Sequence, residues 1–530
     1  MIRRFTPALL FAAGSLCAQS PVRLYTDLGT YHKGIGTKVP EAQQYFDQGL
    51  RLVYGFNHAE AIRSFTRATE LDPNCAICWW GIAYAYGPHV NAGMDSASGV
   101  SAYQAAQKAR SLSSHAAPWQ RAYIEAVAVR YAAVPPANRA GLDSAYSRAM
   151  RDVAKHYPND LDATALAAES MMDLRPWNYW TPDGKPYPGT MEIVRQLESV
   201  IARNPEHPGA CHYYIHAVEA ANPQLAVPCA ERLARLMPGE GHMVHMPAHI
   251  YIRVGRYKEA AASNVHAIHM DETFIEGQPQ ATLYSLGYYP HNIHFLAFAS
   301  SMAGESARAI EAAKTLKSKV NMDVAKNVGM LQEMVPYYVL TLTTFGRWDD
   351  VLAEPLPPAE MRFPTAMARY ARGVAYAAKG DFANAKVELD SVMSIDAATP
   401  ADAEHKAPIA IAVHALMGEI ATRSGKADEG VAHFRQALAI EDKGLYFEPP
   451  KWYYPIRESL GAALLKSGRN AEAEAVYRED LKRFPENGWS LYGLGAALRA
   501  QGKNAEAAAV EKRFATAWSD ADVKLTASRF

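Results

Sequence analysis

Small and large apolar residues recur along the chain at the spacing of paired amphipathic helices. The first two segments share this pattern around one proline: Gly49, Ala61, Phe65, Ala68 and Pro73, then Trp79, Ile82, Ala83 and Tyr86. It returns at Gly255 and Ala260, at Gly373, Tyr376, Gly380 and Ala385, at Gly425, Phe434 and Ala437, at Gly461, Ala473, Tyr477 and Pro485, and at Leu491, Leu494, Gly495 and Ala507. Steps of three and four residues predict helices, and strands have no obvious place.

The spacing of these residues resembles the tetratricopeptide repeat family. The resemblance begins at about Glu41 and implies an all-α solenoid of antiparallel helix pairs, with loop insertions near the central repeats. We expect N-terminal repeats over 41–133, an irregular central region over 134–315 and C-terminal repeats over 316–530. Phrases such as DLRPWNYWTPDG and GHMVHMPAHIYIRVGRY are similar to large exported bacterial proteins of this family, to which we attach no reaction.

The first residues predict export. Arg3 and Arg4 precede an apolar run from Ala8 to Ala13, and Leu16-Cys17-Ala18 fits a cleavage site. We therefore expect a signal peptide over 1–18, an N-terminal extension over 19–40, and a periplasmic or secreted protein. The run is too short to cross a bilayer and no later segment is longer, so no membrane span is expected.

Length and charge limit the number of domains and argue against nucleic acid as a partner. The chain has 530 residues, 49% of them hydrophobic, and a formal net charge of -1. This is long enough for several domains or one long repeat array. Because Lys and Arg form no basic run, nucleic acid is not an expected partner.

Ten of the 18 histidines lie between His207 and His294. They include a pair four apart, a set at i, i+3 and i+7, and a pair three apart: His212 and His216; His242, His245 and His249; His291 and His294. Each set falls on one face of its expected helix. The pairs His212/His216 and His245/His249 also stand at the same distances from Pro205 and Pro238, so they occupy equivalent places in consecutive repeats.

In the family that the chain resembles, these places line the concave groove of the first helices, and Glu219 shares the face of His216. Neighbouring helices lie about 10 Å apart, so their imidazoles can converge. Imidazole suits copper, iron and zinc, and a carboxylate beside it suits iron. We predict a transition-metal site from His212, His216, His245 and His249, then His242, His291 and His294, with Glu219 last. The sequence is compatible with one bound ion or with two.

Other histidines are interpreted as structural. His32, His115, His156, His405, His414 and His433 are isolated, and His266 and His269 belong to the second helix of their repeat. His207 precedes its helix and has no assigned role. His58 and His89 lie in the first two repeats and should be far from the cluster unless the superhelix curls back.

Two insertions flank the cluster, over 173–190 and 271–289, and neither can be a simple helix. Long ordered loops often bind ligands. Trp177, Trp180, Tyr284, Tyr288 and Tyr289 could therefore wall a substrate pocket. The alternative, that they fill gaps between irregular repeats, carries equal weight.

Cysteine and catalytic motifs add little. Cys75 and Cys78 form a CxxC for which a disulfide is plausible after export, and we expect Cys211 and Cys229 to be unpaired and buried. The sequence has no phosphate loop, HExxH or GxSxG motif. His212 and His216 have zincin spacing, but Tyr213 stands where the catalytic glutamate would be.

Two functions remain. The first is an exported metalloprotein, with copper- or iron-dependent oxidation of a small or peptide substrate as its possible activity. The second is a metal-free scaffold that binds a peptide or partner helix in its groove.

Overall fold

The computed structural model describes residues 22–278 and 282–530 and divides into two compact units. Unit 1 comprises residues up to Ile250 together with His266–Ser285, and unit 2 comprises Tyr251–Val265 together with Leu286–Phe530. Neither predicted boundary, at 133/134 or at 315/316, coincides with this division. The predicted signal peptide, 1–18, lies outside the described residues, as does the start of the extension.

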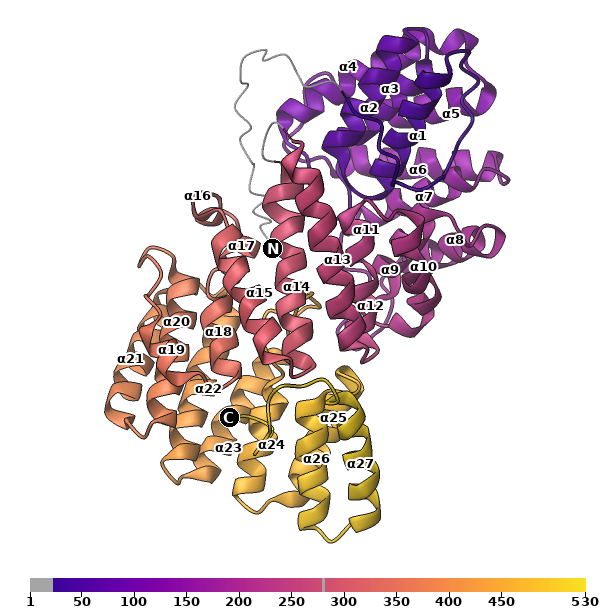
Figure 1. Cartoon of the computed structure of the whole chain (residues 1–530). Helices are drawn as coiled ribbons and strands as arrows, with labels where there is room; N and C mark the ends of the chain where they lie inside the picture. The colour runs from indigo at the N-terminus through magenta and orange to yellow at the C-terminus, as the bar shows by residue number, and fades with distance from the viewer. Residues whose placement is uncertain (1–21, 279–281) are drawn as a thin grey trace. The chain divides into compact units, whose positions relative to one another are not determined.

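Unit 1 is built from short antiparallel helices (Figure 1). Its helices are α1 (Pro40–Tyr54), α2 (His58–Leu71), α3 (Ala76–Ala85), α4 (Ser96–Leu112), η1 (Ser113–His115), α5 (Pro118–Ala128), α6 (Ala140–His156), α7 (Leu161–Met172), α8 (Thr190–Arg203), α9 (Pro208–Val218), η2 (Pro223–Ala226), α10 (Val227–Leu236) and α11 (Gly241–His245). Residues of α12 (Pro247–Arg253), α13 (Tyr257–Glu276) and η3 (Tyr284–Tyr288) are divided between the two units.

The recurring glycine and aromatic positions interlock neighbouring helices. A Cβ atom added to Gly49 or to Gly81 would come within 2.6 Å of the Phe65 ring. In unit 2, Tyr477 stands in the same way against Gly461 and Gly493. The sequence pattern therefore encodes the packing, because a large side chain on one helix fills the space that glycine leaves on the two helices beside it.

Unit 1 also packs its first helix against a late one. α1 contacts α9, and a Cβ on Gly209 would come within 2.3 Å of the Tyr54 ring. Only glycine permits this close approach. The helix that carries His212 and His216 thus lies directly beside the end of α1.

Unit 2 also consists of antiparallel helix pairs, with the short helices α16 to α19 among them (Figure 1). Its helices are α14 (Tyr289–Met302), α15 (Ser306–Lys319), α16 (Met322–Ala325), α17 (Gly329–Met334), α18 (Tyr337–Thr344), α19 (Trp348–Ala353), α20 (Arg362–Ala378), α21 (Phe382–Ala398), α22 (Lys406–Arg423), α23 (Ala427–Glu441), α24 (Ile456–Lys466), α25 (Asn470–Arg483), α26 (Gly488–Ala500) and α27 (Asn504–Ala517).

The C-terminal tail ties the end of unit 2 to its beginning. The Asp522 carboxylate accepts hydrogen bonds from the main-chain N–H groups of Ser306 (2.7 Å) and Ala307 (2.9 Å) and so caps the N-terminus of α15. Trp489 of α26 donates its indole N–H to the Ser301 carbonyl on α14 (3.0 Å). The first and last helix pairs of the unit are therefore in direct contact.

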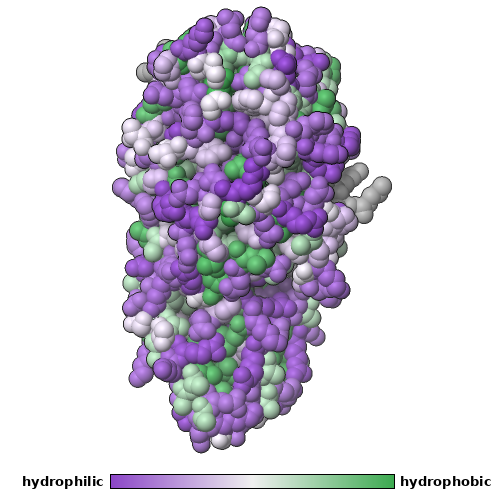
Figure 2. All heavy atoms as spheres, turned by 90° about the vertical axis from the view of Figure 1, so that its right-hand side faces the viewer, coloured by the Kyte–Doolittle hydropathy of each residue, from purple (hydrophilic) through white to green (hydrophobic). Residues whose placement is uncertain are grey.

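The predicted all-α architecture of stacked helix pairs is confirmed. Among the described residues, the extended structure is limited to two isolated β-bridges, His89 with Ala92 and Trp180 with Pro186. On the face drawn in Figure 2, hydrophilic residues cover most of the surface and hydrophobic ones lie in small groups among them. None of the helices described here has the length and apolar character needed to cross a membrane.

The cysteines follow expectation. Cys75 and Cys78 form a disulfide at the start of α3. Cys211 and Cys229 are buried and not joined to each other.

Candidate metal centre

Helix α9 presents two histidines from one face. The imidazole of His207 caps its first turn by accepting the Ala210 N–H (3.1 Å), and Pro208 occupies the first helical position, where its missing N–H costs nothing. His207 is thus a helix cap. His212 and His216 are one turn apart further along, so their rings meet.

The rings of His212 and His216 face each other through atoms that both carry lone pairs. His212 Nδ1 lies 2.6 Å from the Tyr54 main-chain carbonyl, which can only accept, so Nδ1 of His212 carries the hydrogen. His216 Nδ1 lies 3.2 Å from Oε1 of the Glu219 carboxylate and donates in the same way. The two Nε2 atoms are 3.2 Å apart, and in neutral rings neither has a hydrogen to offer. A cation between them would satisfy both.

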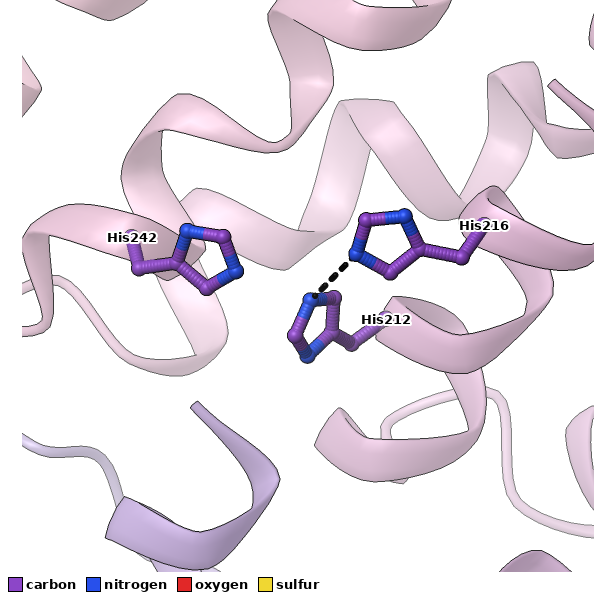
Figure 3. A group of neighbouring side chains, drawn as sticks. All are labelled: His212, His216 and His242. Carbon is purple, nitrogen blue, oxygen red and sulfur yellow. Dashed lines mark hydrogen bonds between the residues drawn. The ribbon is translucent and has the colours of Figure 1, made fainter. Parts of the chain in front are cut away.

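His242 of α11 supplies a third imidazole. Figure 3 shows its ring facing the His212–His216 pair from a different helix. One ligand nitrogen from each of the three residues lies within 4.8 Å of the other two. Three converging imidazoles are a common ligand set for transition metals.

The predicted single helix for His242, His245 and His249 is wrong. Pro247 has no main-chain N–H to continue the hydrogen-bond ladder, and the segment divides there into α11 and α12. His245 and His249 nevertheless meet across this break, with their Nε2 atoms 2.8 Å apart.

Glu219 links the two histidine pairs. Its Oε1 faces Nδ1 of His216, and its Oε2 accepts from Nδ1 of His249 at 3.0 Å. Glu219 is also one of the metal ligands predicted from the sequence. Here each carboxylate oxygen orients one imidazole, as the carboxylate partners of metal-bound histidines do.

The cluster is buried rather than open along a groove. The exposed fractions of its members are at most 2%, for His212, His216, Glu219, His242, His245 and His249. Phe56 lies against His212 with ring centroids 4.5 Å apart, and Trp177 stands edge-on to His216 at 4.9 Å. These two aromatic side chains cover the rings.

Phe56 and Trp177 are held in an uncommon backbone conformation. Their φ angles are 56° and 64°, in the left-handed region that costs about 1–2 kcal/mol for a residue with a side chain. Strain of this kind persists where the surrounding structure enforces it and is typical of functional sites. Both strained residues point their rings at the same histidine cluster.

His89 is nearer to the cluster than the linear repeat order predicts. Phe56 stacks on His89 (4.5 Å between centroids, 22° between planes) while its other contacts include His212, and His58 packs on His89 at 4.5 Å. The exception to the expected distance, a superhelix that curls back, therefore applies to His89. Because α1 packs against α9, Phe56 in the loop after α1 lies beside the cluster. His89, in the turn after α3, packs on Phe56 and so lies nearby as well.

The electrostatics of the cluster favour neutral rings and a charged carboxylate. Burial lowers the pKa of His212, of His216 and of His242. Burial alone would raise the pKa of Glu219, but the neighbouring His249 and His216 lower it to about 2. Neutral imidazoles present the lone pairs that a metal ion requires.

The remaining predicted ligands belong to unit 2. His291 and His294 lie on α14, where His294 is buried and its ring packs edge-on against Tyr337 at 4.1 Å. That they complete the cluster stays a prediction. His266 and His269 are exposed on α13, as expected for the second helix of their repeat.

The predicted pocket residues have different surroundings. Trp180 donates its indole N–H to the Ala217 carbonyl (2.7 Å) and anchors the first insertion to α9. Tyr284 donates to Asp271 (2.8 Å) and accepts the main-chain N–H of His242 (3.2 Å). Tyr288 and Tyr289 are buried residues of unit 2. Of the five, Trp177 has ring contacts with the cluster, and the pocket itself stays a prediction.

The second insertion begins later than predicted. Residues 271–276 continue α13 to Glu276, and residues 284–288 form the π-helical turn η3. The first part, DETFIE, has no helix-breaking residue, so the helix runs on to the turn at Gly277.

Comparison with known proteins identifies the repeats. A family model described as tetratricopeptide repeat matches residues 459–522. These C-terminal helix pairs are tetratricopeptide repeats. The match runs from within α24 to beyond the end of α27 and includes Gly461, Tyr477 and Gly493, whose packing is described above. The resemblance seen in the sequence is thereby confirmed.

Solved structures are similar along most of the chain but only at low scores. Human IFIT1 in a dimer with m7Gppp-AAAA is 12% identical, with 92% of each chain covered and a TM-score of 0.32. Yeast Tom70 is 12% identical, with 91% of this chain and 92% of that chain covered and a TM-score of 0.30. At these scores the likeness carries no argument about function. The comparison with curated proteins found no match.

Proposed function

We propose that unit 1 binds a transition-metal ion through His212, His216 and His242. One observation supports this most strongly: two Nε2 atoms lie 3.2 Å apart while both Nδ1 atoms of the same rings are engaged by acceptors. Two nitrogens bound about 2.0–2.1 Å from one tetrahedral ion stand about 3.3 Å apart. The separation therefore fits two ligands of a single ion.

A shared proton is the alternative to a metal between two imidazoles. A proton joins two acceptors along one line, and it gives no role to a third ring. The ligand nitrogen of His242 lies within 4.8 Å of the other two, so three nitrogens converge rather than two. Convergence of three donors favours an ion.

The donor set restricts the metal. Imidazole ligands suit zinc, copper, iron and nickel, and the Glu219–His216 hydrogen bond is the outer partner that such sites use to fix a ring. Copper or iron bound here supplies one-electron chemistry, and zinc supplies a Lewis acid. Copper- or iron-dependent oxidation of a small or peptide substrate is the activity that we propose, with Trp177 at the edge of the site.

We also propose that the protein works outside the reducing cytosol. The Cys75–Cys78 disulfide supports this location, because such bonds are rare where glutathione and thioredoxin keep thiols reduced. The predicted signal peptide points the same way. Localisation of the epitope-tagged chain between periplasm, medium and cytosol tests it.

Metal content tests the central proposal. The chain is purified without a histidine tag from cells supplied with copper, iron and zinc, and its metals are measured beside those of the His212→Ala/His216→Ala variant. We expect the wild-type protein to retain metal through gel filtration and the variant to lose the ion held by these rings. His266→Ala/His269→Ala is the matched control, because it removes two exposed histidines of unit 1.

Two outcomes contradict the proposal: no retained metal in the wild type, even after reconstitution, or equal metal in the wild type and the His212/His216 variant. The first outcome leaves the metal-free scaffold as the function to pursue, with peptide binding by the repeats as its assay.

A further inference from the structure

We infer that the cluster holds two metal ions, the second at His245 and His249, and that Glu219 couples them. This inference rests on the proposed function, since it assumes an ion at His212, His216 and His242. It adds a second site and a defined role for the carboxylate.

The two histidine pairs repeat one arrangement on either side of Glu219. In each pair the residues are four apart, and their Nε2 atoms face each other at 3.2 Å (His212/His216) and 2.8 Å (His245/His249). In each pair the later histidine donates its Nδ1 hydrogen to one oxygen of the same carboxylate. The second Nε2–Nε2 gap is therefore the place where we look for a second ion.

The second gap has the dimensions of two ligands on one ion. Nitrogens at 2.0–2.1 Å from an ion are about 2.8–3.4 Å apart for bond angles between 90° and 110°. His249 gives its Nδ1 hydrogen to Glu219, so its Nε2 carries a lone pair directed at His245. Ring contacts continue from one pair to the other, with His216 and His249 centroids 5.7 Å apart.

Glu219 makes the two positions dependent on each other. A buried carboxylate with both oxygens engaged by imidazole N–H groups offsets positive charge on both sides at once. An ion on His216 Nε2 polarises the Nδ1 hydrogen of the same ring and draws more strongly on the carboxylate. The second ion then meets like-charge repulsion and a weaker acceptor, so we expect stepwise binding with a weaker second step.

A glutamine at position 219 separates two roles of the carboxylate. The amide oxygen of glutamine accepts one Nδ1 hydrogen, but its NH₂ group can only donate. The ring that faces the NH₂ must place its hydrogen on Nε2 and so loses the lone pair that would bind metal. Glu219→Gln should therefore damage one of the two positions and spare the other.

Copper titration of the wild-type protein gives the first test. Cu²⁺ is added to metal-free protein, excess is removed against a weak chelator, and the retained copper is counted by elemental analysis and electron paramagnetic resonance. We expect two retained ions, with an isolated signal after the first equivalent and a dipolar-broadened spectrum after the second. Saturation at one ion overturns this inference and leaves the proposed function standing. No retained ion overturns both.

Variants then assign the two positions. We expect one retained ion in His245→Ala/His249→Ala and one in His212→Ala/His216→Ala, each with a narrow spectrum. We expect about one ion in Glu219→Gln. Glu198→Gln removes the same charge from an exposed residue that accepts from Tyr214 of α9 (2.8 Å), and it should keep two.

Two retained ions in His245→Ala/His249→Ala place the second ion elsewhere and overturn the second site. Two ions with unchanged affinities in Glu219→Gln overturn the coupling role. Circular dichroism on each variant checks folding, and the wild-type titration decides the stoichiometry without any variant.

Discussion

Two buried carboxylates of unit 2 and one buried histidine pair of unit 1 show different ways of burying polar groups. In unit 2, buried carboxylates meet donors: Glu333 accepts from Lys451 (2.8 Å), and Asp480 accepts from Ser490 (2.6 Å) and Asn487 (3.0 Å). In unit 1, acceptor faces acceptor at His212 and His216 (3.2 Å).

Burial of polar groups is costly unless each one finds a partner. At Glu333 and Asp480 of unit 2, other side chains of the protein supply such partners. In unit 1, His212 and His216 donate their Nδ1 hydrogens to Tyr54 and Glu219. The lone pairs on their Nε2 atoms point toward each other. The comparison thus separates a network that stabilises the fold from one that we propose to be arranged around an ion.

Removal of metal should affect one unit only, and this is the largest expected effect. An ion present at a hundred times its dissociation constant stabilises the folded state by about 2.7 kcal/mol. We expect a chelator to lower the hydrogen-exchange protection of peptides from α9 and α11 by about this amount. Peptides from α24 to α26 of unit 2 serve as the internal control. Equal change in both units, or none in either, contradicts the assignment of the site to unit 1.

Compared over one pH unit, the next largest effect is the pH dependence that the buried carboxylate Glu458 should give to the stability of unit 2. Burial raises its pKa from 4.5 to about 8, although Arg529 opposes the shift. Between these values the native state holds a proton that the unfolded state releases, so stability is full below pH 4.5 and falls as pH rises toward 8. The loss is about 1.4 kcal/mol per pH unit.

Glu458→Gln should reduce this slope by about 1.4 kcal/mol per pH unit, because the amide cannot ionise. Its oxygen can still accept from Asn487, which donates to Glu458 Oε1 at 2.9 Å in the wild-type structure. Burial also raises the pKa of Glu441 to about 8 and that of Asp480 to about 6, so part of the slope remains. The measurement is urea unfolding between pH 5 and pH 8. Glu506→Gln on the exposed face of α27 is the control for loss of charge. A slope that is unchanged in Glu458→Gln would assign the dependence to other groups.

Two left-handed residues, one in each unit, give the smallest contrast. Trp177 (φ 64°) packs on the cluster, and Glu486 (φ 55°) contacts Arg513 at the surface of unit 2 (2.7 Å). Glycine relieves about 1–2 kcal/mol of strain at either position but adds entropy to the unfolded chain. We expect Glu486→Gly to change stability by about 1 kcal/mol or less without altering metal retention.

Trp177→Gly should instead speed metal release by about tenfold, since it uncovers His216. Stopped-flow transfer of metal to a chelator measures this rate. Release at the wild-type rate in Trp177→Gly would show that the ring does not protect the site.

Much of this arrangement could be predicted from the sequence because it is local. Gly49 and Phe65 encode helix packing at repeat spacing, and the equivalent places of His212 and His245 predict that their helices bring them together. Both inferences use distances of one or two repeats along the chain. The structure of unit 1 agrees with them.

The surroundings of the cluster depend on contacts that cannot be read from the spacing of the repeats. Tyr54 acts on His212 through its main-chain carbonyl, which no side-chain pattern records, and Phe56 reaches the cluster only because α1 packs on α9. In the sequence, Gly209 is the residue that could have indicated the close packing of α9 on α1. The break at Pro247 could have been foreseen from proline chemistry alone.

The tail of unit 2 has a consequence for how that unit comes apart. An open repeat array can fray from an end, because each repeat contacts only its neighbours. Asp522 holds the first turn of α15, and Trp489 holds the end of α14, so neither end of unit 2 is free. Such long-range closure favours one cooperative transition over stepwise melting, and the closure of unit 2 can form only after Asp522 has been synthesised.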